Sequence, residues 1–161
     1  KNPSFTPFLS ALHETFADGS FIACTRAPVE VIPSQLSSLV PVMALLGNGK
    51  LNALIQDKIL ELLYRYYEII QQQAARNNLA VISMEMLQSD LKKTMHGLYR
   101  YIDQEMSAVY LQRLDELVAK AKSYQSRHRY HVEEFSLTEE VIQLKFSKVW
   151  PVKPTLLMVD E

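Results

Sequence analysis

Hydrophobic residues recur every three to four positions through the middle of the chain, which is the spacing of one face of an α-helix. The clearest such segment runs from Lys50 to about Asn77, and its polar positions are confined to a narrow face. A helix that is apolar around most of its circumference must be covered on several sides. We therefore predict a central helix here, whose main stripe consists of Leu51, Ile55, Ile59, Leu62, Tyr66 and Ile69.

A second regular pattern begins at Met84, directly after Ser83, which suits the cap of a helix. Its apolar residues alternate steps of three and four, close to the roughly 3.5-residue repeat of a coiled-coil seam. The pattern continues past Met106 as far as Tyr124. It predicts either one helix of about forty residues or two antiparallel helices joined near Ser107, and the sequence leaves both alternatives open.

The distribution of prolines supports long helices in the middle of the chain. All seven prolines lie toward the two ends, and none occurs between Val42 and Val149. Proline removes a backbone donor and breaks or kinks a helix, so this stretch permits helices without interruption.

The segment before the central helix predicts shorter elements. Thr6 and Pro7 suit the cap and first turn of a short helix, and Ser34 suits the cap of a second. Between them, residues 20–33 contain apolar clusters typical of one or two short strands. Further along, residues 79–82 are expected to be briefly extended.

After Ser126 the hydrophobic period changes from helical to two. Residues 130–133 and 141–147 alternate apolar and polar side chains, which is typical of half-buried strands and predicts a β-hairpin. A helix beginning at Thr138 is the alternative, since two glutamates follow it. The β-branched residues of the later stretch favour the strand.

Together these patterns predict a mainly α fold, a bundle of long helices with short N-terminal helices and a small antiparallel β-sheet or hairpin made from N- and C-terminal strands. We expect a single domain over residues 1–161. Within it, 1–49 form short helices and strands, 50–126 the long-helix core, and 127–161 the hairpin and a tail. Because the chain begins with Lys1 rather than methionine, we expect an excerpt of a longer protein.

Composition narrows the class of protein. With 48% hydrophobic and 22% charged residues, the chain has the composition of a folded globular protein. A net charge of -1 provides no overall basic field for nucleic acid. Cys24 is the only cysteine, which excludes an internal disulfide. A single cysteine suits a reducing compartment, so we expect an intracellular protein. No apolar run reaches the roughly 18–20 residues needed to cross a bilayer, so we expect no membrane span.

The main concentration of positive charge is the segment 120–131, where tyrosines lie between cations. Cationic side chains suit phosphate contacts, and aromatic rings suit base stacking. The same cations also suit a solvated helix end, because the helix dipole favours positive charge at its C-terminus. The candidate contacts for nucleic acid or another anion are Lys120, Lys122, Arg127, Arg129, Tyr130 and Lys145.

Signals for catalysis, cofactors or metals are weak. The sequence has no phosphate loop, glycine-rich nucleotide fingerprint or serine elbow. His128 and His131 are three residues apart, which places them on opposite faces of a strand and disfavours a shared metal. We predict no catalytic, cofactor-binding or metal-ligating residues, and an enzyme without a recognisable motif is the third hypothesis.

The leading functional hypothesis is a non-enzymatic protein–protein interaction or assembly module that docks an apolar helical surface onto another protein or onto a second copy. Nucleic-acid binding through the basic segment is the alternative. Methionines on the seam would make the contact surface adaptable. The candidate partner surface consists of Met84, Leu87, Leu91, Met95, Tyr99, Ile102 and Met106.

Overall fold

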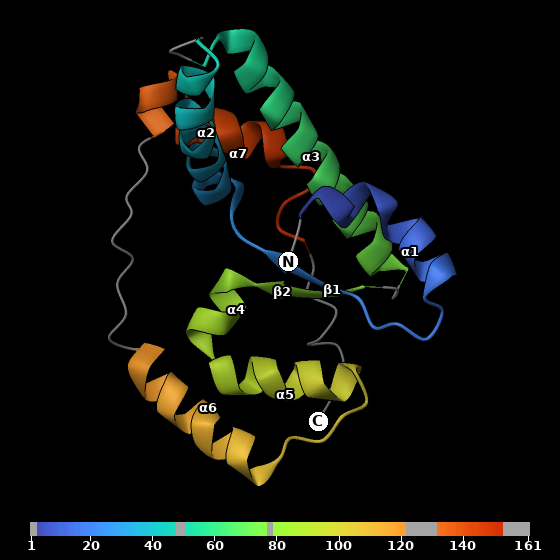
Figure 1. Ribbon diagram of the computed structural model, residues 1–161. Coiled ribbons are helices and arrows are strands. Elements are labelled where there is room, and N and C mark those ends of the chain that lie inside the picture. The colour runs from blue at the N-terminus through green and yellow to red at the C-terminus, as the bar shows by residue number, and fades with distance from the viewer. Residues whose placement is uncertain (1–2, 48–50, 77–78, 122–131, 153–161) are drawn as a thin grey trace.

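The chain is mainly helical, with two groups of helices on either side of a small sheet (Figure 1). The computed structural model describes residues 3–47, 51–76, 79–121 and 132–152. The upper group comprises α2 (Pro28–Leu45), α3 (Ala53–Ala75) and α7 (Glu139–Phe146). The lower group comprises α4 (Met84–Ser89), α5 (Leu91–Tyr101) and α6 (Ala108–Ala121). A 3-10 helix, η1 (Pro3–Phe8), leads into α1 (Leu9–Thr15), and another, η2 (Val132–Phe135), precedes α7.

The predicted central helix is confirmed as α3. Asn52 caps it, because its side chain accepts a hydrogen bond from the backbone N–H of Ile55 at 2.9 Å. The side chains that it buries, including Leu60, Leu63 and Tyr67, recur at helical spacing but lie beside the predicted main stripe. In that stripe Leu62 is 44% exposed and the other five residues are half-buried. The helix contacts α2, η1 and β2, so it is covered on several sides as its sequence requires.

The main core lies between α2, α3 and α7. Ile32 and Leu36 of α2 are fully buried, and α7 contributes the equally buried Ile142 and Phe146. Aromatic rings hold α7 against α3. The ring of Phe146 meets those of Tyr64 and Tyr67 edge-on at centroid distances of 5.8 and 5.7 Å, and Tyr67 meets Trp150 at 5.6 Å.

The hydroxyl of Tyr67 fastens α3 to the segment before α2. It donates a hydrogen bond of 2.6 Å to the backbone carbonyl oxygen of Arg26, and burial raises the pKa of this phenol above its ordinary value.

Replacing Tyr67 with phenylalanine leaves that carbonyl without its partner, so we expect the free energy of unfolding to fall by about 1–2 kcal/mol in urea denaturation. Tyr66→Phe is the control, because its hydroxyl has no hydrogen-bond partner among the described residues. Equal losses from both variants would contradict this role.

The sheet is parallel rather than antiparallel, which corrects the predicted fold. Within the described residues it consists of β1 (Ile22–Thr25) and β2 (Ala80–Ser83), with Ile22 opposite Ala80. Extended structure was expected in both segments, but the predicted sheet paired N-terminal with C-terminal strands, whereas β1 pairs with β2 in the middle of the chain. Parallel strands need a long crossover, and α2 with α3 supplies it.

The predicted C-terminal hairpin is wrong where the structure describes it. Residues 132–135 form η2 and 139–146 form α7, which Thr138 caps by accepting a hydrogen bond from the backbone N–H of Val141 at 3.4 Å. In a strand, Ile142, Leu144 and Phe146 would share one face. In the structure Ile142 and Phe146 are 0% exposed and Leu144 is 78% exposed, which is the pattern of a helix. Residues 127–131 and 153–161 of this predicted region lie outside the described residues.

The N-terminal elements also differ from the prediction. Ser34 does not cap a separate helix, because α2 begins at Pro28 and includes the residues 29–32 that favoured a strand. Proline suits the first turn of a helix, where its missing N–H needs no partner. Thr6 and Pro7 lie inside η1, and α1 starts after them, at Leu9.

The pattern that begins at Met84 is divided into separate helices. Ser83 caps α4 as predicted, accepting a hydrogen bond from the backbone N–H of Met86 at 3.2 Å. The chain then breaks at Asp90, whose side chain caps α5 through the N–H of Lys93. The joint near Ser107 is confirmed, since the Ser107 hydroxyl accepts a hydrogen bond from the N–H of Tyr110 at the start of α6. The single forty-residue helix is therefore excluded.

Candidate interaction surface

The predicted partner surface does not form one continuous seam. Its residues are divided among α4, α5 and the turn after α5, and all of them are half-buried: Met84, Leu87, Leu91, Met95, Tyr99, Ile102 and Met106. Part of this surface is already used within the chain, because α5 contacts α6 and β2. Tyr99 lies 5.1 Å from Tyr110 of α6 between ring centroids, and burial together with this neighbour raises the pKa of Tyr110. Partner binding by these seven residues stays a prediction.

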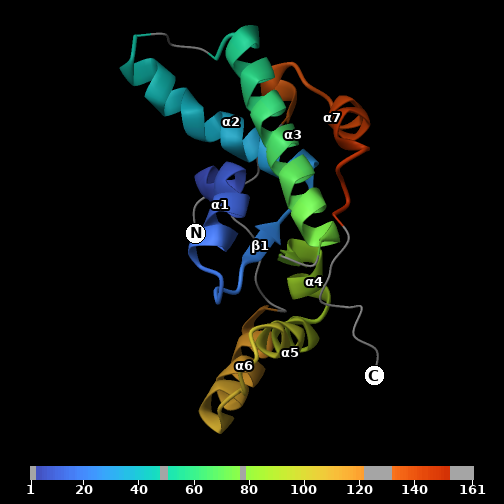
Figure 2. The same cartoon turned by 90° about the vertical axis from the view of Figure 1, so that its right-hand side faces the viewer.

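The predicted anion contacts are only partly described. Lys120 lies near the end of α6 and Lys145 lies on α7, and these two helices are at opposite ends of the molecule (Figures 1 and 2). The structure therefore does not bring the two lysines together. The other four candidates, Lys122, Arg127, Arg129 and Tyr130, lie outside the described residues.

The most exposed apolar helix end is the C-terminal half of α2. Residues 39–46, Leu-Val-Pro-Val-Met-Ala-Leu-Leu, form the longest uninterrupted apolar run in the sequence. This end of the helix projects away from α3 (Figure 2). Leu45 is 86% exposed and Leu46 is 69% exposed, and Val40 and Val42 are also exposed. We call residues 39–46 the α2 tip.

The uncovered apolar surface of the α2 tip could have been predicted from its sequence, although residues 39–46 show no helical periodicity. A helix on the surface of a globular core needs apolar residues on one face only. Eight consecutive apolar residues place such side chains around the whole circumference of about two turns. Leu39 and Met43, four residues apart, are half-buried, while the other six residues are exposed. An uncovered apolar surface follows from the run itself.

The length and composition of α2 would also allow a membrane span. Among the described residues it is the one helix with both the length and the apolar character for a span: its 18 residues have a mean hydropathy of 1.2, and 22% of them are buried. Its N-terminal half packs into the protein core through Pro28, Ile32 and Leu36. Because half of this helix is packed against other helices of the protein, its length and composition are weak evidence for a membrane span.

A second exposed apolar patch lies at the N-terminal end of the described chain. Phe5 and Phe8 are three residues apart in the 3-10 helix η1, which places them on the same side. Both rings are more than half exposed, as is Phe16 just after α1. Polar residues interrupt this aromatic row, including Ser10 and Glu14, so it is less continuous than the α2 tip.

The described residues offer little to a metal ion. They contain no group of three or more His, Cys, Asp or Glu side chains arranged to hold one. His128 and His131, for which the sequence pattern disfavoured a shared metal, lie outside them. His13 packs its ring 4.3 Å from that of Phe21 between centroids, and its buried Nε2 has no hydrogen-bond partner in the described part of the chain.

Comparison with models of known protein families, with curated proteins and with solved structures finds no match to this chain.

Proposed function

We propose that this chain is a protein–protein assembly module that associates with a second copy of itself through the α2 tip. The observation that carries the proposal is the exposure of Leu45 and Leu46 at the end of a helix that projects from the core. Removing apolar surface from water stabilises a complex by roughly 25 cal/mol per Å². A surface of this kind on a folded chain is typical of a protein interaction site.

Because the α2 tip carries no charge, it can bind favourably only to a partner surface of matching polarity. Residues 39–46 include no ionisable side chain, so a complementary surface must itself be apolar. The α2 tip of a second copy is such a surface. Two tips packed about a two-fold axis would cover each other, because in a symmetric contact each copy uses the same patch.

Glutamates at the two most exposed positions should abolish this association. We expect the unmodified chain to show twice the monomer mass by light scattering at about 100 µM. Replacing Leu45 and Leu46 with glutamate places four negative charges in the two-fold contact, where no cation of the tip can pair with them. The variant should therefore be a monomer, with a dissociation constant raised at least about 100-fold.

Val109→Glu is the matched control, because Val109 is 78% exposed but lies on α6 in the lower group of helices. It should leave the mass unchanged. A monomeric parent chain at about 100 µM, or a dimer that survives both glutamates, would contradict the proposal. Absorbance at 260 nm that co-elutes with the protein and disappears in high salt would favour the nucleic-acid alternative.

A further inference from the structure

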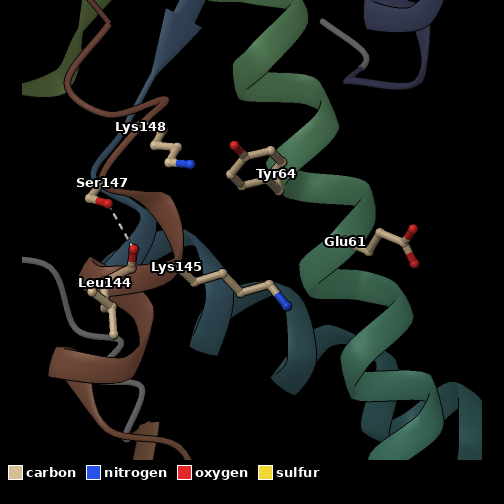
Figure 3. Close-up of a pocket in the computed structure, with 6 residues that line it drawn as sticks. All are labelled: Glu61, Tyr64, Leu144, Lys145, Ser147 and Lys148. Carbon is tan, nitrogen blue, oxygen red and sulfur yellow. Dashed lines mark hydrogen bonds between the residues drawn. The ribbon is translucent and has the colours of Figure 1, made fainter.

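A pocket opens between α3 and α7, on elements distinct from the α2 tip (Figure 3). Its volume is about 340 Å³, and it is lined by Glu61, Tyr64, Leu144, Lys145, Ser147 and Lys148. Pockets of about 300–1,000 Å³ are the size that small molecules occupy in proteins. The lining combines an aromatic ring and a leucine with two ammonium groups.

The charge of this pocket is positive. Lys145 extends from α7 toward α3, and the ammonium group of Lys148 points toward Tyr64 (Figure 3). Neither lysine has an ion-pair partner among the described residues. The one carboxylate of the lining, Glu61, is already paired with Lys58 at 3.0 Å. The hydrogen bond and charge of Lys58, with smaller contributions from Arg65 and Lys145, lower the pKa of Glu61, so this carboxylate is ionised and its nearest cation is Lys58.

Tyr64 forms the wall of the pocket on the α3 side. Its ring is half-buried and lies edge-on to the fully buried ring of Phe146. Phe146 lies between Lys145 and Lys148 in sequence, so the same packing positions the backbone of both lysines. The hydroxyl of Tyr64 has no hydrogen-bond partner among the described residues and is directed toward the Lys148 side of the pocket. It is available to donate to an oxygen anion.

We propose that this pocket binds a small phosphate monoester. The phosphate lies between Lys145 and Lys148 and accepts a hydrogen bond from the Tyr64 hydroxyl. Its organic group packs against the Tyr64 ring. Hydrogen bonds between cationic donors and phosphate oxygens are about twice as strong as those between neutral groups, so two lysines suit a dianion. The inference does not rest on self-association through α2.

Titration calorimetry with phenyl phosphate and with inorganic phosphate, at constant ionic strength, tests this site. We expect saturable binding of phenyl phosphate with a dissociation constant of about 1 mM or below, and weaker binding of inorganic phosphate, which cannot contact the ring. Replacing Lys145 and Lys148 with glutamine should weaken phenyl phosphate at least about 10-fold. Tyr64→Phe keeps the ring and should weaken it about 3-fold through the lost hydroxyl.

Lys93→Gln with Arg100→Gln is the control, because it removes the same charge from exposed positions of α5, and neither side chain has an ion-pair partner among the described residues. It should leave the affinity unchanged. No saturation of phenyl phosphate at about 10 mM would overturn the proposal. An equal loss of affinity in the control variant would also overturn it, because it would indicate general attraction to a cationic surface. Equal affinity for phenyl phosphate and inorganic phosphate would show that the Tyr64 ring makes no contribution, and would overturn it too. The circular dichroism spectrum of each variant should match that of the parent chain, since the substituted cationic side chains are exposed.

Discussion

Replacing Phe146 with alanine is expected to lower the free energy of unfolding by about 3–5 kcal/mol. The Phe146 side chain is 0% exposed and packs against the rings of Tyr64 and Tyr67, so its removal leaves a cavity where α7 meets α3. Close-packed cores collapse only partly around such a cavity, and the lost contacts add to the lost burial. Urea denaturation followed by circular dichroism measures the change.

Leu144→Ala is the matched control, on the same helix and two residues away. Leu144 is 78% exposed, so its truncation should change the free energy of unfolding by less than about 0.5 kcal/mol. The pair of variants also tests the secondary structure of this segment. In a strand the two side chains would share the buried face, and both truncations would then be costly.

An aspartate in place of Val81 is expected to cost more than about 3 kcal/mol at neutral pH. Val81 is 1% exposed and belongs to the core cluster, so the new carboxylate would be buried in apolar surroundings. Burial raises the pKa of such a carboxyl above its unfolded value. The unfolded state therefore ionises first as the pH rises, and the destabilisation grows from the ordinary pKa of aspartic acid up to the raised one. Denaturation at acid pH should recover the part of the loss that comes from ionisation.

Cys24→Asp places the same residue in the same sheet at an exposed position of β1. At this exposed position only the low strand propensity of aspartate matters, so the free energy of unfolding should fall by less than about 1 kcal/mol. If the two aspartate variants were equally stable at neutral pH, the burial of Val81 described above would be incorrect.

The elements set by local pattern were predictable. The apolar residues between Leu51 and Ile70 recur at helical spacing and predict α3 correctly. The most buried side chains, Leu60, Leu63 and Tyr67, nevertheless lie beside the predicted main stripe. Ser83 was also predictable as a cap. Its hydroxyl accepts a hydrogen bond from a backbone N–H in the first turn of α4, where the helix itself offers no carbonyl partner. In both cases the physical cause lies within a few residues of its effect.

The character of α7 was ambiguous for a geometric reason. Ile142 and Phe146 share a face in a helix and in a strand alike, because four residues are close to one helical turn and are also two strand repeats. Leu144 is the residue whose position distinguishes the two structures. A leucine suits the buried face of a strand, but here it is exposed and lines the pocket with Tyr64. The capping interaction of Thr138 was the better signal.

Strand pairing and the candidate site depend on contacts between distant residues. Extended structure near Ile22 and Ala80 could be predicted from local residues, but the direction of pairing depends on the path of α2 and α3 between them. Likewise, the exposure of Leu45 depends on where α3 leaves α2 uncovered (Figure 2). The apolar run 39–46 predicts that some apolar surface stays uncovered, but it does not show which of its residues do, and the direction of strand pairing has no local signal.

The contribution of residues 132–152 to the main core has a consequence for synthesis. Val132, Ile142 and Phe146 cover apolar faces of helices that are complete by Ala75. While the chain is being translated from its N-terminus, those helices leave the ribosome with their apolar faces uncovered and remain so for more than fifty further residues. A nascent chain that stops before α7 therefore exposes its future core to solvent and to other chains, and cooperative folding has to wait until this last packing layer has emerged.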